Sequence, residues 1–294
     1  MNTTGSGYRG GETMNTTGSG SGGSMHLVVD VGNTETALGL FRPGTTVVAG
    51  HWRYSTTVPR TEDELFLLYR ALLREGGMEL EALGRIVVGS VVPSHTDTLA
   101  RALHRLSSVE VVHVDSVAGL PICLDVEEPL TVGADRIVNT LAAAQLFGRD
   151  TVVVDLGTAT TYDCITGDGV FLGGVIAPGL KAGQLWLKGH TAKLPGVDFA
   201  PPDRVIGRRT EACLRSGIFH GAVAAVDGIV DLIREEWERP EALVVSTGGW
   251  APLLSPHSRT IQEVHPHLTL VGLELAGRWL TGEMTGKAGE SVAK

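Results

Sequence analysis

The feature that most constrains this chain is a short pattern that occurs twice: a β-branched run, then Asp-x-Gly, then small polar residues. The first copy is Val28–Thr34 and the second is Val152–Thr160. Each copy is followed by more strand-like sequence, so each predicts a strand, a tight glycine turn and a second strand. Such a turn directs backbone N–H groups and a carboxylate to one point, which suits a phosphate and its metal ion. Two copies in two halves of one chain predict two facing loops that hold one polyphosphate.

The N-terminal segment is typical of an expression tag rather than of folded protein. Met1–Gly7 recurs as Met14–Gly20, and a Gly/Ser run extends the segment to Ser24. We therefore exclude residues 1–24 from the fold, expect them to be disordered, and expect the native chain to begin at Met25. Two Gly-x-Gly-x-x-Gly matches within the segment follow no strand, so we interpret them as accidents of composition.

Composition indicates a globular α/β protein of one large or two medium domains. Hydrophobic residues make up 43% and charged residues 19% of the chain, as in ordinary globular domains. The net charge of −9 argues against a nucleic-acid partner, which needs a basic surface. No apolar run reaches the roughly 18 residues of a membrane span. Three scattered cysteines indicate idle or buried thiols, so we expect a cytoplasmic protein without a membrane partner.

The order of the expected elements indicates a duplicated fold. The two halves begin with the same arrangement of three strands, at 26–31, 36–41, 46–54, 151–155, 161–165 and 170–176. Helices and further strands follow in each half, which implies mixed sheets. We place the boundary at residue 148, with an N-terminal domain of residues 25–147, a C-terminal domain of residues 148–294, and a cleft between them.

Three helices of the second half are predicted from apolar spacing and from Gly and Pro positions. One is expected to start at Pro178 and end near Lys188. A long helix is expected from Arg209 to Trp237, broken near Gly221. A closing helix is expected over residues 270–280, and the last dozen residues are expected to be disordered.

Three aspartates could carry chemistry. Asp30 and Asp155 follow apolar strands, at the position where open α/β sheets place their ligands. One Asp-x-Gly alone is more typical of a capped turn, but its repetition favours phosphate binding. Asp135 lies beside Arg136 in the first turn of a helix predicted after Gly133. It is either a partner of the helix dipole or a general base beside an anion-binding arginine, and these residues alone leave both interpretations open.

Two further motifs can be interpreted either as ordinary loops or as functional sites. Thr247-Gly248-Gly249 follows a strand and could open a nucleotide pocket, because glycines let a ligand approach the backbone; it could equally be a plain turn. His265-Pro266-His267 suggests a metal site but is more typical of a surface loop.

The motifs recur in a characteristic order. They are Asp30-x-Gly32-Asn33-Thr34, Gly133-Ala134-Asp135-Arg136-x-x-Asn139, Asp155-x-Gly157-Thr158-Ala159-Thr160-Thr161-x-Asp163, Gly173-Gly174-x-Ile176-x-Pro178-Gly179 and Thr247-Gly248-Gly249. From Met25 to about Leu280 the chain resembles the type III pantothenate kinase family, of the acetate and sugar kinase, heat-shock protein and actin superfamily. The resemblance implies an α/β, duplicated RNase H-like (actin-like ATPase) two-domain fold with mixed sheets and ATP in the interdomain cleft.

The resemblance also implies an activity and roles for residues. The activity is ATP-dependent phosphorylation of pantothenate to 4'-phosphopantothenate, the first step of coenzyme A biosynthesis. Asp135 would accept the proton, Asp155 would hold a monovalent cation (K⁺ or NH₄⁺), and Thr158 would contact ATP. The first loop would bind the ATP phosphates, with Mg²⁺ placed by its aspartate, through Asp30, Val31, Gly32, Asn33, Thr34, Glu35, Thr36 and Ala37. Pantothenate would contact Gly133, Ala134, Asp135, Arg136 and Thr210, in a pocket closed by the partner subunit of a homodimer.

One departure from the family pattern keeps alternatives open. Relatives often carry a tyrosine shortly before the proline that precedes Gly-Ala-Asp-Arg, and here that place is near Val126. We therefore assign no aromatic contact to the substrate. Two other functions stay possible: a kinase of another small alcohol such as a sugar, and a non-catalytic transcription-accessory regulator of the same fold.

Overall fold

The computed structural model describes residues 24–190 and 195–285 of the chain. The expected disorder of the tag and of the last residues falls almost wholly outside the described residues. The strands are β1 (Met25–Val31), β2 (Glu35–Phe41), β3 (Val48–Ser55), β4 (Leu83–Ser90), β5 (Val111–Val114), β6 (Cys123–Leu124), β7 (Thr151–Leu156), β8 (Ala159–Ile165), β9 (Val170–Pro178), β10 (Leu243–Thr247) and β11 (Glu263–Val264). The helices are α1 (Glu62–Glu75), α2 (Pro93–Leu106), α3 (Ala134–Phe147), α4 (Leu180–His190), α5 (Thr210–Glu236), α6 (Ala251–Leu254) and α7 (Leu268–Leu280).

Two sheets repeat one topology, which confirms the predicted duplication. The first sheet has the order β3-β2-β1-β4-β5 and the second has the order β11-β10-β7-β8-β9-β6. In both, an antiparallel three-stranded ribbon (β1–β3 or β7–β9) is extended by parallel strands (β4 and β5, or β10 and β11). The equivalent aspartates occupy the same register, because Asp30 pairs with Ala37 and Gly89 while Asp155 pairs with Thr161 and Thr247.

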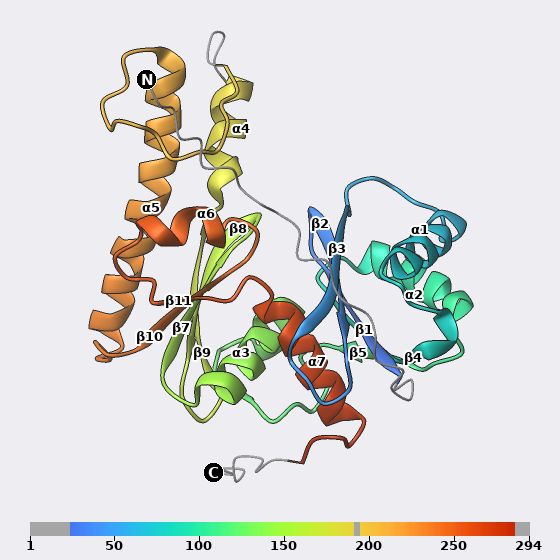
Figure 1. The fold of residues 1–294 in the computed structure, drawn as a ribbon. Coiled ribbons are helices and arrows are strands. Elements are labelled where there is room, and N and C mark those ends of the chain that lie inside the picture. Colours follow the sequence, from blue (N-terminus) through green and yellow to red (C-terminus); the bar gives the residue numbers. More distant parts are fainter. Residues whose placement is uncertain (1–23, 191–194, 286–294) are drawn as a thin grey trace, which may run out of the picture.

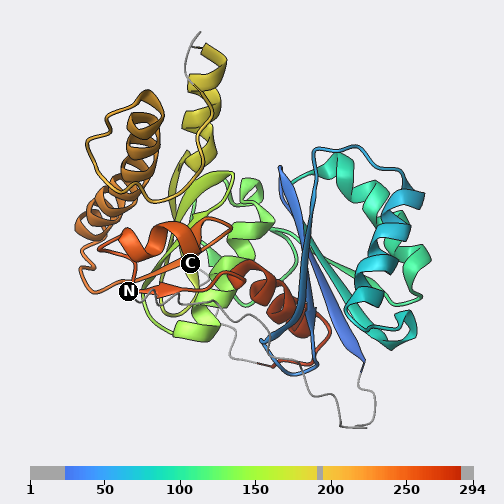
Figure 2. The same cartoon turned by 45° about the horizontal axis from the view of Figure 1, so that its top comes forward.

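Helices cover both faces of each sheet, as Figures 1 and 2 show. Helices α1 and α2 pack on the outer face of the first sheet, and α5 and α6 pack on the outer face of the second. Helices α3 and α7 lie between the sheets, in a core shared by both. Alternate residues of β1 serve different cores, since Val28 faces α7 and Val29 faces α1 and α2. Burial on both faces explains why this strand is a continuous apolar run.

The crossing of α3 and α7 fixes how the halves meet. A Cβ atom at Gly272 of α7 would collide with the main-chain carbonyl of Val138 in α3. Only glycine lets the two helices approach this closely. Their contact brings the N-terminus of α3 to the ends of β1 and β7, where the predicted site lies.

Several boundaries differ from the sequence-based expectations. Helix α5 continues through Gly221 without a break, and Pro178 ends β9 instead of starting α4. Both expectations were wrong because local Gly and Pro signals were outweighed by packing on the second sheet. The proposed boundary at residue 148 stays a prediction, and two elements cross it: β6 pairs with β9, and α7 packs against β1 and β4.

Helix α5 is long and apolar enough to cross a membrane, judged by length and composition alone. One face of it packs on the second sheet through Phe219, Val223, Val226 and Val230. Asp227 on the same helix accepts hydrogen bonds from the loop after α6, including the backbone N–H of Thr260. A helix that is anchored in this way does not indicate a membrane protein.

Candidate active site

The first hairpin, defined as Gly32–Thr34 between β1 and β2, follows directly after Asp30. The N–H of Gly32 donates to the carbonyl oxygen of Glu35 at 3.1 Å. A Cβ at Gly32 would lie 2.9 Å from that oxygen, so the tight turn requires glycine at this point. Asn33 is exposed and Thr34 is partly exposed at the tip, where their polar groups can meet a ligand.

The second hairpin, defined as Gly157–Thr158 between β7 and β8, repeats this turn after Asp155. The N–H of Gly157 donates to the carbonyl oxygen of Ala159 at 3.0 Å. Gly248, at φ +88°, approaches so closely that any Cβ there would collide with the Asp155 carboxylate. The Thr247-Gly248-Gly249 motif therefore lies directly against the second hairpin.

The two hairpins touch each other. The Thr158 hydroxyl donates to the Thr34 hydroxyl at 2.9 Å, across 124 residues of sequence. This contact confirms the prediction that two Asp-x-Gly turns from opposite halves of the chain face one another.

Asp135 lies in the first turn of α3, near enough to the aspartates of both hairpins for its charge to act on them. Its Oδ1 accepts the N–H of Arg136 at 2.9 Å, and a Cβ at the preceding Gly133 would lie only 2.5 Å from the same oxygen. Its negative charge raises the pKa values of both Asp30 and Asp155. Three predicted site residues, two from strands and one from a helix, are thus brought together at one place.

The aspartates of both hairpins have strongly raised pKa values. Burial, then the charges of Asp135 and Asp155, raise the pKa of Asp30 to about 8. Burial, then the charges of Asp135 and Asp163, raise the pKa of Asp155 to about 7, against a hydrogen bond from the Asn139 side chain that lowers it. Because negative charge is concentrated here, the site favours cations or protons.

Arg136 is held by a carboxylate that the sequence analysis did not assign to the site. Its Nε donates to Oδ1 of the fully buried Asp163 at 2.7 Å, and its guanidinium lies 4.9 Å from the centre of the Phe171 ring. Burial raises the pKa of Asp163 to about 7, although the Arg136 charge and hydrogen bond oppose this. Within the described chain, Nη2 of Arg136 and Oδ2 of Asp163 are buried and have no hydrogen-bond partner.

Asp163 and Asn139 belong to the quoted sequence motifs, but neither was predicted as a site residue. Asp163 ends the second Asp-x-Gly motif, and Asn139 lies one turn of helix after Asp135. The i, i+4 spacing of Asp135 and Asn139 puts both on one helix face, which was a usable signal. Asp163 carried a weaker signal, because its partner is 27 residues away.

The remaining predicted residues divide into two groups. Val31 and Thr36 are buried, and the Thr36 hydroxyl is 2.8 Å from that of Thr56, so both serve the fold of the first hairpin. Thr210 is exposed as the first residue of α5, on the pair of helices that projects from the second sheet (Figure 1). No described contact joins Thr210 to Asp135 or Arg136.

Comparison with known proteins identifies the family. The profile of the type III pantothenate kinase family matches residues 26–232. A type III pantothenate kinase of Anaeromyxobacter dehalogenans is 42% identical over 253 residues, which cover 85% of this chain and 98% of the relative. The chain belongs to the type III pantothenate kinase family. A second member, from Syntrophotalea carbinolica, is also 42% identical and is covered to 97%.

Solved structures support the fold of this family member. A protein described as a Baf family transcriptional activator from Campylobacter jejuni superimposes with a TM-score of 0.54 at 17% identity, covering 88% of this chain and 100% of that one. Component A of the Acidaminococcus fermentans (R)-2-hydroxyglutaryl-CoA dehydratase gives a TM-score of 0.51 at 11% identity, covering 88% and 98%. The two-sheet architecture of this chain is therefore a fold that other solved proteins share.

Proposed function

We propose that this chain transfers the γ-phosphoryl group of ATP to the primary hydroxyl of pantothenate, the first step of coenzyme A biosynthesis, in the cytoplasm. The observation that carries the proposal is the position of Asp135, whose charge acts on the aspartates of both hairpins. A kinase needs a proton acceptor beside its phosphate loops. Membership of the family supplies the identity of the alcohol.

The hairpins provide the phosphate-binding part of the site. The N–H groups of Gly32 and Gly157 close their own turns. The other amides of the two hairpins would donate to phosphate oxygens, together with the hydroxyls of Thr34 and Thr158, which touch each other. Asp30 would place Mg²⁺ and Asp155 would hold the monovalent cation, because each carboxylate has a raised pKa that a cation would lower. The described residues contain no group of three or more His, Cys, Asp or Glu side chains able to hold a metal. This fits Mg²⁺, which is commonly held by one or two carboxylates, waters and substrate phosphates.

Asp135 would act as the general base. The pantothenate hydroxyl oxygen bonds to the γ-phosphorus, the bond to the β–γ bridging oxygen breaks, and the hydroxyl proton passes to the Asp135 carboxylate. Bound Mg²⁺ would neutralise charge on the phosphates. Positioning by the hairpins and by α3 would supply most of the rate enhancement, as in other phosphoryl transfers.

Arg136 and its neighbours would bind the acceptor. The partly exposed guanidinium would pair with the carboxylate of pantothenate, while Asp163 and Phe171 fix its plane. Gly133 and Ala134 would line the same wall. Gly174 belongs there too, because a Cβ at this position would lie 3.0 Å from Nη2 and would restrict the arginine.

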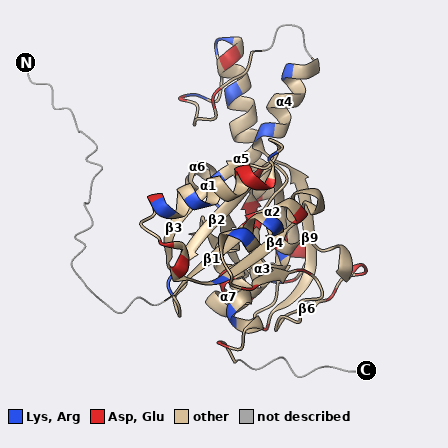
Figure 3. Cartoon of the chain, turned by 90° about the vertical axis from the view of Figure 1, so that its right-hand side faces the viewer, with Lys and Arg blue, Asp and Glu red and all other residues tan. Residues whose placement is uncertain are grey.

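A homodimer would complete the pocket and place Thr210. Helices α4 and α5 project together, and α4 carries only two charged side chains, Lys181 and Lys188 (Figure 3). Large apolar side chains are exposed on and beside this projection: Ile176, Leu185, Trp186, Val205 and Ile206. Exposed apolar side chains of this kind are typical of a subunit interface.

An ADP-release assay tests the proposal. The protein is offered MgATP with pantothenate or with simple sugars, in the presence and absence of K⁺. We expect pantothenate-dependent turnover that K⁺ stimulates. Turnover with a sugar alone would indicate the alternative kinase, and binding of ATP without turnover on any alcohol would indicate the regulator.

A further inference from the structure

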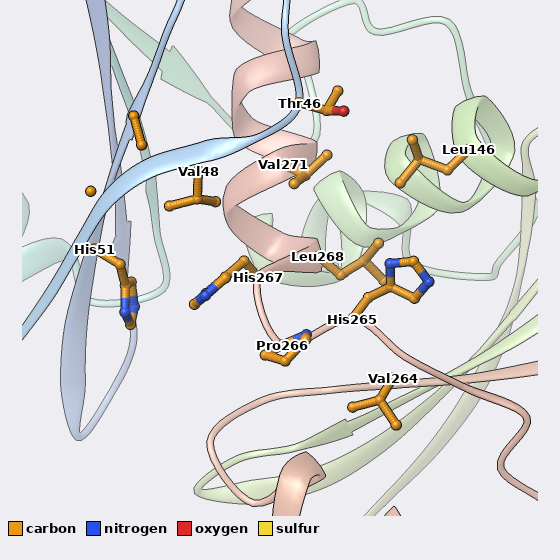
Figure 4. A pocket seen from close by; sticks show the side chains of 12 residues that line it. Thr46, Val48, His51, Leu146, Val264, His265, Pro266, His267, Leu268 and Val271 are labelled. Carbon is orange, nitrogen blue, oxygen red and sulfur yellow. The ribbon is translucent and has the colours of Figure 1, made fainter. Parts of the chain in front are cut away.

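A second cavity lies outside the site discussed so far. It has a volume of about 470 Å³ and opens between β3, the edge of the first sheet, and the segment that joins β11 to α7. Its walls combine aliphatic side chains, among them Val48, Leu146 and Val271, with three imidazoles (Figure 4). A cavity of this size and mixed lining is typical of a small-molecule site.

Two of the imidazoles form a pair that points into the cavity and can contact a ligand. The rings of His51, on β3, and His267, just before α7, have centroids 4.5 Å apart, and both point into the cavity (Figure 4). Burial, then His267 and Arg53, lower the pKa of His51 to about 4, and burial and Arg53 lower that of His267. Both rings are therefore neutral at pH 7, with one donor and one acceptor each. None of the hydrogen bonds among the described residues uses either ring.

His265 differs from this pair. Its Nε2 lies 2.9 Å from the Glu263 carboxylate and its ring packs at 5.2 Å on Phe147. It is thus already engaged by its neighbours. The described residues hold no cluster of three metal-ligating side chains, so the three histidines do not form a metal site.

Arg53 connects the cavity to the phosphate-binding hairpins. It lies two residues after His51 on β3, on the same face of the strand. Its Nη1 is 3.5 Å from the carboxylate of Glu35, which follows the first hairpin, and a Cβ at Gly249 would lie 3.2 Å from the same nitrogen. A molecule bound by its phosphates at the hairpins could therefore extend past Arg53 into the cavity.

The lining selects the chemical class of the ligand. Neutral imidazoles in an apolar cavity offer no charge for a free anion but can stack and exchange hydrogen bonds with a planar nitrogen heterocycle. We propose that this cavity receives the adenine base of ATP, stacked on the His51–His267 pair, with Arg53 beside the ribose and α-phosphate. The assignment rests on the proposed function for its ATP. It gives a role to His51 and Arg53, which no sequence motif indicated, beside His267.

Binding measurements on single variants test this assignment. His51→Ala and His267→Ala are compared with His104→Ala, an exposed histidine on α2, by calorimetric titration with MgATP and with magnesium tripolyphosphate, which has no base. We expect each cavity variant to weaken MgATP binding about tenfold, as loss of stacking does. Tripolyphosphate binding should stay at the wild-type level, and His104→Ala should match wild type with both ligands. In steady-state assays the effect should fall on KM for ATP, with KM for pantothenate unchanged.

Two outcomes would overturn the assignment. Unchanged MgATP binding would show that the base lies elsewhere, and equal weakening of MgATP and tripolyphosphate would show a general structural effect. His51→Gln, which keeps a hydrogen-bonding group on the edge strand, covers the case in which an alanine variant misfolds, and it should lose less MgATP affinity than His51→Ala would. A wild-type protein that binds MgATP but does not phosphorylate pantothenate would refute the proposed function and leave this assignment testable.

Discussion

The two hairpins share a motif and a register, yet their aspartates have different surroundings. Among the described residues, none donates a hydrogen bond to the Asp30 carboxylate, whereas the Asn139 side chain donates to Asp155. Gly248 also covers Asp155 so tightly that no side chain fits between them. Beside the first hairpin lies an exposed ion pair, Glu35 with Arg53.

This difference suggests that the two hairpins bind different cations. A carboxylate with a fixed protein donor and a closed cover suits an ion that stays in place through many turnovers. A carboxylate without any donor depends on a cation that arrives and leaves with its ligand. We therefore expect Asp155 to serve the resident monovalent cation and Asp30 to serve the Mg²⁺ of the nucleotide.

Asp135→Asn should have the largest effect, because it removes the charge that both hairpins face. Without a proton acceptor, turnover should fall by about 10²–10⁴-fold. The pKa values of Asp30 and Asp155 should also fall, since a like charge is lost. ADP release measures the first effect and thermal melting checks the fold, with the exposed Asp97→Asn on α2 as the matched control. Near-wild-type turnover would remove Asp135 from its role.

Exchanging each hairpin aspartate for asparagine sharpens the comparison directly. Asp30→Asn should raise the Mg²⁺ concentration needed for half-maximal activity by about 10–100-fold while K⁺ stimulation persists. Asp155→Asn should abolish K⁺ stimulation with a smaller effect on Mg²⁺. Titrations of both ions against ADP release measure the two responses. The same response in both variants would show that the hairpins act alike.

Much of this arrangement follows from the sequence. Each Asp-x-Gly turn was predicted from its own few residues, because β-branched runs and a turn glycine act locally. Because the motif is duplicated, the two turns were predicted to face each other, and the Thr158–Thr34 contact confirms this. The Thr-x-x-Glu spacing of Thr61 and Glu64 is likewise a local signal, and the capping box is formed at the start of α1.

What could not be predicted depends on contacts between distant segments. The buried group of His26, Arg85 and Glu274 joins β1, β4 and α7, and nothing in the local sequence indicates that the closing helix returns to the first sheet. The pairing of His51 with His267 has the same origin, since 216 residues separate two side chains that only the fold brings within 4.5 Å. Strand β6 is two residues long, too short for any periodic signal.

The raised pKa values of Asp30 and Asp155 predict how the stability of the protein depends on pH. Folded Asp30 and Asp155 have pKa values of about 8 and about 7, against about 3.9 for an unfolded-chain aspartate. The folded state then binds more protons between these values. The free energy of unfolding of the ligand-free protein should therefore fall as pH rises from about 4 to about 8, and this contribution should level off above that.

Thermal melts across this range, with and without MgATP, measure the slope. MgATP should reduce it, because bound cations stabilise the ionised carboxylates. Asp30→Asn should flatten the ligand-free profile more than Asp155→Asn, since Asp30 has the higher pKa. A ligand-free melting temperature that does not change between pH 5.5 and pH 8 would contradict the crowding of charge at the hairpins.

The smallest effect concerns the contact between the hairpins themselves. The hydroxyls of Thr34 and Thr158 are 2.9 Å apart and lie where solvent competes, so their hydrogen bond should stabilise the fold by only about 0.5 kcal/mol. A double-mutant cycle with Thr34→Val and Thr158→Val in chemical denaturation isolates that coupling energy. Because neither hydroxyl has another described hydrogen bond, strictly additive variants would mean that the hairpins stand apart in solution. They would then close only around the nucleotide, and the difference between the two aspartates would arise on binding rather than being built into the free protein.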